Sequence, residues 1–168
     1  WTILAASKIF APFFRLLKYN RNIIISEVVC RMIKAYIDAS TKGNPGPSAG
    51  GILLVGEQLH IQKTIPLPDL TNHQAEFATF VALLDELIEQ KHTKETIFIY
   101  TDSKILAETI EKDYTNNLDF KSYLSEIKAR LPLFDLVIIQ WIPENQNKGA
   151  DNLARQGLQK RLASKNRR

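Results

Sequence analysis

The sequence is short of the residues that build disulfide-linked, membrane-spanning or zinc-binding proteins. It has one cysteine, Cys30, so no disulfide framework is possible, and a reducing, cytoplasmic location is expected. No apolar run approaches the roughly 20 residues that a transmembrane helix needs, so no membrane span is predicted. The three histidines show no metal-ligand spacing with each other or with the cysteine, which argues against a zinc site. Repeats and low-complexity segments are also missing.

What the chain does contain is enough apolar material for one ordinary domain. It has 168 residues, of which 45% are hydrophobic, and this suffices to bury a core. The formal net charge of +4 arises in residues 1–31, because residues 32–168 hold 17 basic and 17 acidic side chains. Overall charge is therefore weak evidence for a nucleic-acid partner. The tail from Arg155 has six basic residues and no acidic one, which indicates a basic patch or a solvated end.

The first 31 residues differ from the rest of the chain. The only methionine is Met32, and a strand-like run follows it at once. The apolar residues before it are interrupted by Lys8, Pro12 and Arg15. We interpret residues 1–31 as an extra N-terminal segment outside the native domain, and residues 32–168 as the domain. The alternative is a short amphipathic anchor or interaction helix.

From Met32 onward the patterns are typical of a mixed α/β domain. The order is β-β-β-α-β-α-α-β-α, which predicts a five-stranded mixed sheet with helices on its faces. Thr71 and Asn72 are expected to cap a long amphipathic first helix. The predicted strands are Lys34–Asp38, Ser48–Gly56, Gln58–Pro66, Thr96–Tyr100 and Leu136–Trp141, and the later helices are Ser103–Lys112, Leu118–Leu131 and Ala150–Leu162.

Four carboxylates stand where these elements begin or end. Asp38 ends the first strand and Asp102 ends the fourth, and ligands of α/β sheets gather at the carboxyl ends of such strands. Glu76 lies in the first turns of the long helix, and Asp151 opens the last one. Each alone fits an ordinary role as a turn or helix cap, or as an acid favoured by the helix dipole. Together they predict one acidic site.

Such a site needs a counter-charge, because four neighbouring carboxylates cannot all stay ionised. Hard oxygen ligands favour Mg²⁺ or Mn²⁺. Two such ions about 3.5–4 Å apart form the usual clamp for in-line attack on a phosphodiester.

A stiff loop follows the first carboxylate, and with it the chain resembles a known family. The stretches "YIDASTKGNPGPSAGG", "TNHQAEFATFVALLDEL", "IFIYTDSKIL" and "WIPENQNKGADNLA" resemble the ribonuclease HI family, in particular its compact branch from low-GC Gram-positive bacteria, often labelled reverse-transcriptase-like. The resemblance runs from about Met32 to Leu162. It implies a ribonuclease H-like fold, in which the first three strands are antiparallel and the last two run parallel to the first.

The resemblance also implies a role for each carboxylate. Asp38 would bridge two metal ions, Glu76 and Asp102 would bind the ion on the leaving-group side, and Asp151 would bind the ion that activates water. The substrate implied is an RNA–DNA hybrid, whose 2′-hydroxyl groups are read in a wide, shallow minor groove.

Substrate contacts are expected from the loop and from helix starts. Gly43 lets the backbone approach the RNA strand, and Asn44 and Asn72 would contact sugars or base edges. Weaker candidates for backbone contacts are Thr71, Ser103 and Lys104, for which capping or solvation is equally expected.

Two departures from the family pattern bear on activity. The loop "IPENQNKG" lacks the histidine that many members carry, so product release or proton transfer would be handled by Glu144 or Asn147, or would be slow. Only "DYTNNLD" separates the middle helices, where other members have a basic handle, so hybrid affinity should be weaker. His73 is expected at the surface or in a cap, and His60 and His92 in solvent.

The leading hypothesis is a monomeric, metal-dependent endonuclease that cuts the RNA strand of RNA–DNA hybrids and leaves 5′-phosphate and 3′-hydroxyl ends. The second is a catalytically weak or inactive hybrid-binding protein on the same fold. A nuclease or transposase of the wider superfamily is disfavoured by the "GNPGP" loop. A purely structural role would leave the four carboxylates unexplained.

Overall fold

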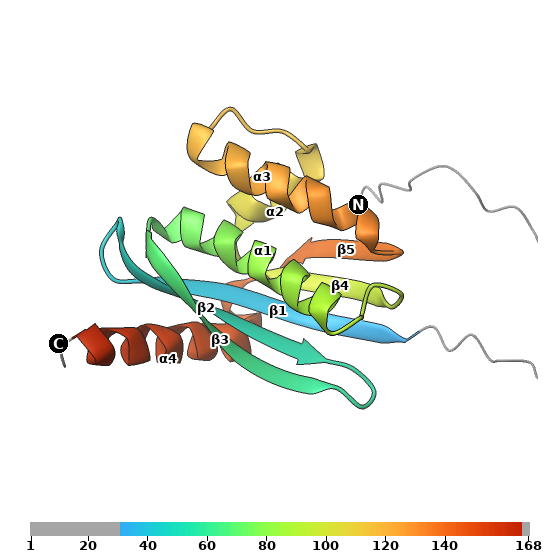
Figure 1. The fold of residues 1–168 in the computed structure, drawn as a ribbon, viewed down its shortest axis with the longest axis horizontal. Coiled ribbons are helices and arrows are strands. Elements are labelled where there is room, and N and C mark those ends of the chain that lie inside the picture. Colours follow the sequence, from blue (N-terminus) through green and yellow to red (C-terminus); the bar gives the residue numbers. More distant parts are fainter. Residues whose placement is uncertain (1–30, 166–168) are drawn as a thin grey trace, which may run out of the picture.

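The computed structural model describes residues 31–165, within which the predicted element order is confirmed (Figure 1). The expectation for residues 1–31 falls, except for Arg31, outside the described residues. None of the described helices is long and apolar enough to cross a membrane. The elements are β1 (Met32–Thr41), β2 (Gly46–Val55), β3 (His60–Leu70), α1 (Asn72–Glu89), β4 (Thr96–Thr101), α2 (Lys104–Lys112), α3 (Leu118–Arg130), β5 (Leu136–Trp141) and α4 (Lys148–Lys165), with short 3₁₀ turns at Leu131–Leu133 and Glu144–Gln146.

The five strands form one mixed sheet in the order β3-β2-β1-β4-β5. Strands β1, β2 and β3 pair antiparallel, β4 pairs parallel with β1, and β5 pairs parallel with β4, so the predicted fold class is confirmed. In the parallel register Ile37 of β1 faces Thr101 of β4. The residues that follow, Asp38 and Asp102, therefore lie side by side at the same edge of the sheet.

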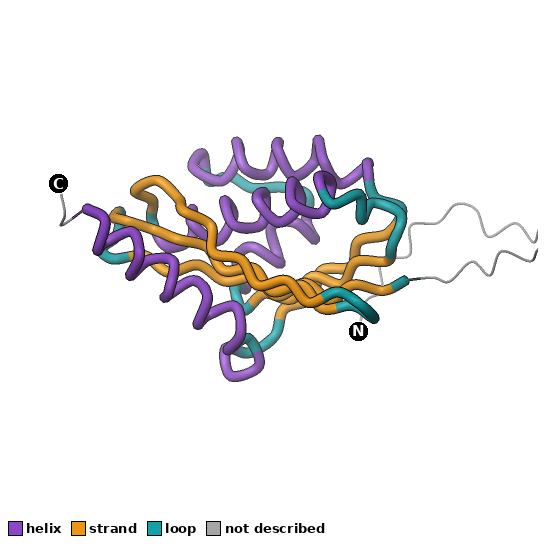
Figure 2. The backbone as a smooth tube through the Cα atoms, turned by 60° about the horizontal axis from the view of Figure 1, so that its bottom comes forward, coloured by secondary structure: helices purple, strands orange, loops and turns teal. Residues whose placement is uncertain are grey.

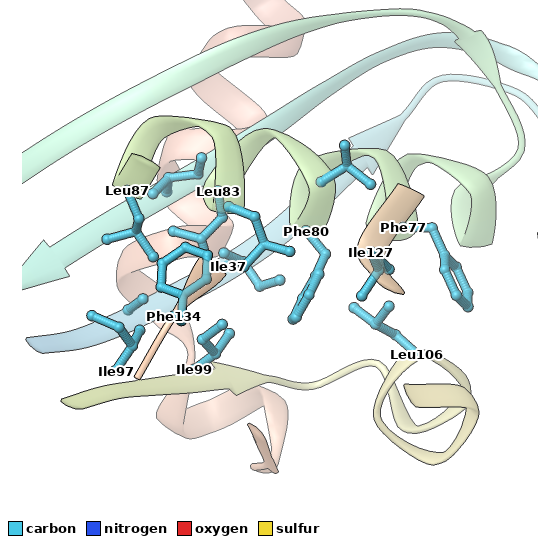
Figure 3. Close-up of a cluster of buried hydrophobic side chains, with 14 of the residues drawn as sticks. Ile37, Phe77, Phe80, Leu83, Leu87, Ile97, Ile99, Leu106, Ile127 and Phe134 are labelled. Atoms are coloured by element: carbon cyan, nitrogen blue, oxygen red, sulfur yellow. The ribbon is translucent and has the colours of Figure 1, made fainter. Parts of the chain in front are cut away.

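The main hydrophobic core fills the space between the sheet and helices α1 and α3 (Figure 3). Phe80 and Leu83 of α1 pack toward Ile97 and Ile99 of β4, and all four are fully buried. Burying each such side chain contributes roughly 1.5–3 kcal/mol. Because side chains alternate along a strand, Ile37 points into this core while its neighbour Asp38 is directed to the opposite face.

Helix α4 covers that opposite face, over β1, β2 and β3 (Figure 2). The contact is close because Gly51 of β2 has no side chain. A Cβ atom at Gly51 would lie 2.2 Å from the backbone oxygen of Ala150 and 2.5 Å from the backbone nitrogen of Ala154. This packing brings the start of α4, with Asp151, to the face on which Asp38 stands.

Several details differ from the sequence-based expectations. Strand β1 continues past Asp38 to Thr41, so Asp38 does not end that strand, and α4 begins at Lys148 rather than at Ala150. Strand β3 begins at His60 rather than Gln58, because residues 56–59 form the turn that the Gly56 N–H closes on the Leu59 oxygen at 2.8 Å. The same strand continues past two prolines to Leu70, which is possible because it lies at the edge of the sheet. His92 is not a solvent residue: its side chain is only 21% exposed, and its Nδ1 lies 3.4 Å from Glu95 Oε1.

Candidate active site

All four carboxylates singled out from the sequence line one cleft. The cleft has a volume of about 550 Å³ and opens where β1 and β4 end. Asp38 comes from β1, Glu76 from α1, Asp102 from the residue after β4, and Asp151 from α4. The remaining lining residues are Ala39, Ser40, Thr41, Asn72, Trp141, Pro143, Glu144 and Arg155.

Asp38 is the carboxylate with the strongest electrostatic perturbation. Burial, together with the negative charge of Asp102, raises its pKa from 3.8 to about 7. The Ala39 N–H donates a 2.8 Å hydrogen bond to Asp38 Oδ1, which opposes the rise but does not cancel it. Without a cation beside it, Asp38 is therefore partly protonated near neutral pH.

Glu76 is held in place by its neighbours on three sides. The Ser103 hydroxyl donates a hydrogen bond to Glu76 Oε2, and the Asn72 amide donates to Oε1 at 3.4 Å. The Nδ1 atom of His73 lies 3.5 Å from Oε2. Burial raises the pKa of Glu76, and the hydrogen bond from Ser103 counteracts that rise.

Asp102 stands at the end of β4, beside the aromatic residue that ends β5. The Trp141 indole N–H donates a 2.9 Å hydrogen bond to the Asp102 backbone oxygen. Burial raises the pKa of the Asp102 carboxyl, and the charges of Glu144 and Asp151 add to the effect.

Asp151 differs from the others because it already has a basic partner. The Arg155 Nε atom donates to Asp151 Oδ1 at 2.7 Å, one helical turn along α4. Arg155 is 62% exposed, so this ion pair is worth only a few tenths to about 1 kcal/mol and is easily exchanged.

Asn147 is a residue of the site whose function the sequence reasoning missed. Its side chain is buried, with the residue only 1% exposed, and its amide donates a 2.8 Å hydrogen bond to the Ile37 oxygen. Its own backbone oxygen accepts the Asp151 N–H at 3.1 Å. A residue so engaged is not a mobile substitute for the missing loop histidine, whereas the exposed Glu144 on the cleft wall remains available for that role. Asn147 directly precedes α4 in the structure, but the helix was expected to begin only at Ala150, so its position gave no capping signal in the sequence.

The loop after β1 is shaped as its glycines and prolines predict. Gly43 has a φ of 92°, and a Cβ atom at Gly46 would lie 1.9 Å from the Lys42 oxygen. The Lys42 N–H closes the loop on the Pro47 oxygen at 2.9 Å. The Asn44 side-chain oxygen accepts the Asn72 N–H at 3.1 Å, so the tip of the loop is attached to the start of α1 beside the cleft.

The three weaker candidates have structural partners. Thr71 caps α1 in a capping box with Gln74. Ser103 is 7% exposed, caps α2 and binds Glu76, so it acts through that carboxylate. Lys104 does not line the cleft; it is 76% exposed and lies 3.7 Å from Glu108.

The donor set of the cleft fits divalent cations. In residues 31–165 no three acidic, histidine or cysteine side chains stand close enough to ligate one ion as they are oriented here. This agrees with the hydrogen bonds that hold Glu76 and with the ion pair that holds Asp151. Carboxylate oxygens are nevertheless the ligands that Mg²⁺ and Mn²⁺ prefer. The raised pKa of Asp38, caused first by burial and then by the charge of Asp102, shows that its carboxylate form lacks a counter-charge, which a cation would supply.

Comparison with known proteins identifies the family. The sequence model of RNase H matches residues 31–159. The putative hydrolase EbsB of Enterococcus faecalis is 44% identical over 129 residues, which cover 77% of this chain and 96% of that protein. Ribonuclease HI of Halobacterium salinarum is 29% identical over 129 residues, which cover 75% of this chain and 64% of that protein.

Solved structures agree in fold. RNase H1 from Halobacterium salinarum superposes with a TM-score of 0.71 at 27% identity, covering 77% of this chain and 98% of that one. LC11-RNase H1, solved in complex with an RNA/DNA hybrid, has a TM-score of 0.69 at 22% identity, over 77% of this chain and 99% of that one. Sequence, fold and the acidic cleft lead to the same conclusion: the chain belongs to the RNase H family.

Proposed function

We propose that this protein is a metal-dependent endonuclease that hydrolyses the RNA strand of RNA–DNA hybrids. One observation carries the proposal: carboxylates from β1, α1, β4 and α4 line a single cleft in a chain of the RNase H family. The single cysteine and the absence of any recognisable span in the sequence support a cytoplasmic enzyme, which we expect to act as a monomer.

The four carboxylates are proposed as the metal ligands. Asp38, Glu76, Asp102 and Asp151 would hold two Mg²⁺ ions, or Mn²⁺ ions, with Asp38 shared between the two. Bound ions would supply the missing counter-charge and would polarise the attacking water and the scissile phosphate. Asp38 suits the shared position because, without metal ions, burial and the neighbouring carboxylates raise its pKa to about 7 and so disfavour its charged form.

Other residues of this chain prepare the ligands. Ser103 directs Glu76 toward the cleft through its hydrogen bond. Arg155 neutralises Asp151 and has to release it when a cation binds. Glu144 is exposed on the cleft wall, which supports a role in exchanging a proton with the leaving group or with water in place of the missing histidine.

The substrate is proposed to lie across the cleft with its minor groove against the loop and the start of α1. Asn44 and Asn72 are both exposed, and a hydrogen bond joins them. This bond uses only the side-chain oxygen of Asn44, so the side-chain NH₂ group of Asn44 can still donate to a substrate. Gly43 keeps the loop narrow enough for close approach. RNA–DNA hybrids solved with LC11-RNase H1 illustrate the type of ligand.

The test is a cleavage assay on end-labelled substrates of one sequence: RNA–DNA hybrid, duplex RNA and duplex DNA. Each is incubated with Mg²⁺, with Mn²⁺ and with EDTA. We expect cleavage only of the RNA strand of the hybrid, only with metal, leaving 5′-phosphate and 3′-hydroxyl ends.

Two variants sharpen the assay. Asp38→Asn should abolish cleavage, because an amide is a poor ligand at a shared position. Asp135→Asn removes a surface carboxylate that pairs with Lys94 outside the cleft and should leave cleavage unchanged. Hybrid binding without any cleavage in either metal would instead support the non-catalytic alternative, which the missing histidine favours.

A further inference from the structure

Trp141, at the end of β5, presents an aromatic surface inside an acidic cleft. It is 49% exposed, and it lines the same cleft as the four carboxylates. The other lining residues are polar or charged, apart from Ala39 and Pro143. A large apolar side chain left half in solvent at a binding cleft is a candidate contact for a ligand.

The indole is held in a fixed orientation. Its Nε1–H donates a 2.9 Å hydrogen bond to the backbone oxygen of Asp102. On the backbone side, Trp141 pairs with Thr101 in the parallel ladder, and the Ile142 N–H then bonds to the Thr101 oxygen at 2.9 Å. Because the ring is oriented before any ligand arrives, little conformational entropy is lost when a flat group packs on it.

Trp141 also gives the cleft a flat aromatic surface, which its other lining residues do not provide. The carboxylates can interact with phosphate oxygens only through cations. Arg155, the only basic side chain that the described part of the chain contributes to the lining, is paired with Asp151. None of these groups offers a surface for the face of a nucleoside. Aromatic side chains stack on bases and pack on sugars whatever the nucleotide sequence of the ligand.

Resting on the proposed function, we propose that Trp141 is an additional substrate-binding residue. Its indole packs on the nucleoside next to the phosphate that lies at the carboxylates. This uncharged contact on the β5 side of the cleft adds affinity to an enzyme whose α2–α3 connection carries no basic handle. The contact should therefore contribute to affinity without increasing its dependence on salt.

Two substitutions distinguish a substrate contact from a purely structural role of Trp141, because the two roles affect kcat and KM differently. Trp141→Phe keeps a flat ring and loses the N–H bond to Asp102, whereas Trp141→Ala loses both. If the ring contacts substrate, Trp141→Ala should raise KM roughly tenfold, and Trp141→Phe by less than about threefold. If the indole only positions Asp102, both variants should lower kcat equally and leave KM unchanged, and the proposal is wrong.

The matched control is Tyr114→Ala, which removes a 63% exposed aromatic ring outside the cleft and should leave KM unchanged. Melting curves identify any variant that fails to fold. The slope of log KM against log salt should be the same for Trp141→Ala and the unsubstituted protein, because no charge is lost.

A fluorescence measurement tests the contact without catalysis. The chain has two tryptophans, Trp1 and Trp141, so Trp1→Phe leaves Trp141 as the only indole. This variant is titrated with hybrid in EDTA, and binding is followed in parallel by the anisotropy of a dye on the hybrid. Stacking should quench Trp141 emission with the same midpoint as the anisotropy change.

The outcomes distinguish this inference from the proposed function. Quenching by a hybrid that is never cleaved would support the contact and refute the nuclease. The opposite result would be normal cleavage together with two negative findings: Trp141 emission that does not change when hybrid binds, and an unchanged KM in Trp141→Ala. It would overturn the contact and leave the proposed nuclease activity intact.

Discussion

The side-chain amide of Asn147 donates a 2.8 Å hydrogen bond to the backbone oxygen of Ile37, 110 positions earlier in the chain. Ile37 precedes Asp38, and the backbone oxygen of Asn147 receives the N–H of Asp151. One buried side chain thus links the strand that carries the first carboxylate to the helix that carries the last. Together with the packing of α4 on β1 and β2, this bond holds Asp38 and Asp151 on one face of the sheet.

Asn147→Ala should therefore damage both stability and activity. It leaves the Ile37 oxygen without its partner in a buried position, which costs roughly 1–3 kcal/mol. For a domain of this size, that lowers the thermal midpoint by several degrees, and hybrid cleavage should fall because the two carboxylates lose their spacing. Asn145→Ala is the control, since Asn145 lies in the same turn but is exposed. Equal midpoints and rates for both variants would show that the bond is dispensable.

The raised pKa of Asp38 predicts an unusual pH dependence for the metal-free protein. The folded pKa of about 7 exceeds the ordinary value of 3.8, so folding favours the protonated form and penalises the charged one. In EDTA the free energy of unfolding should fall as pH rises from about 4 to about 7, to which Asp38 contributes on the order of 4 kcal/mol. Asp38→Asn should remove this part of the slope and be the more stable protein at pH 8.

Thermal melts of both proteins in EDTA, at closely spaced pH values, measure this difference. Stability curves that run parallel from pH 4 to pH 8 would contradict it. Added Mg²⁺ should raise the midpoint of the unsubstituted protein at pH 8 and have little effect on Asp38→Asn.

The ion pair between Arg155 and Asp151 competes with metal binding. Arg155→Gln removes the competing cation, so the Mg²⁺ concentration for half-maximal cleavage should fall about two- to fivefold, in line with a surface pair worth at most about 1 kcal/mol. Lys160→Gln removes the same charge farther along α4, where the residue is exposed and outside the cleft. A decrease of equal size in both variants would assign the effect to net charge instead of to the pair.

The N-terminal segment is predicted to be dispensable. Residue 32 opens β1, and β1 has a pairing partner on each side, in β2 and β4. Upstream of β1, the described Arg31 contributes one backbone contact, because its oxygen accepts the Thr96 N–H at 3.0 Å. Deleting residues 1–31 should leave hybrid cleavage intact and improve solubility. Melting curves of the two proteins should agree closely. A midpoint lower by about 10 °C in the shorter protein, roughly 2–4 kcal/mol, would mean that the segment is part of the domain.

Much of this fold and the four carboxylates of the site can be predicted from the sequence, because they depend on local patterns. Alternation of apolar residues marks β1, and a capping pair marks the start of α1. Asp38 and Asp102 each come directly after an apolar run, and they follow Ile37 and Thr101, the last pair of the parallel ladder between β1 and β4, so they lie at one edge of the sheet.

The partners of those carboxylates were decided only by the tertiary structure. The sequence predicts Ser103 as a helix cap, and it is one, but its hydroxyl also donates a hydrogen bond to Glu76 on another helix. Trp141 reads as the last apolar residue of a strand, yet it is half exposed in the cleft. Asn147 reads as a loop residue, yet it is buried against β1. Local periodicity reports which side of its own element a residue occupies. These contacts depend on how separate elements pack, and a sequence separation of up to 110 residues leaves no local trace of that packing.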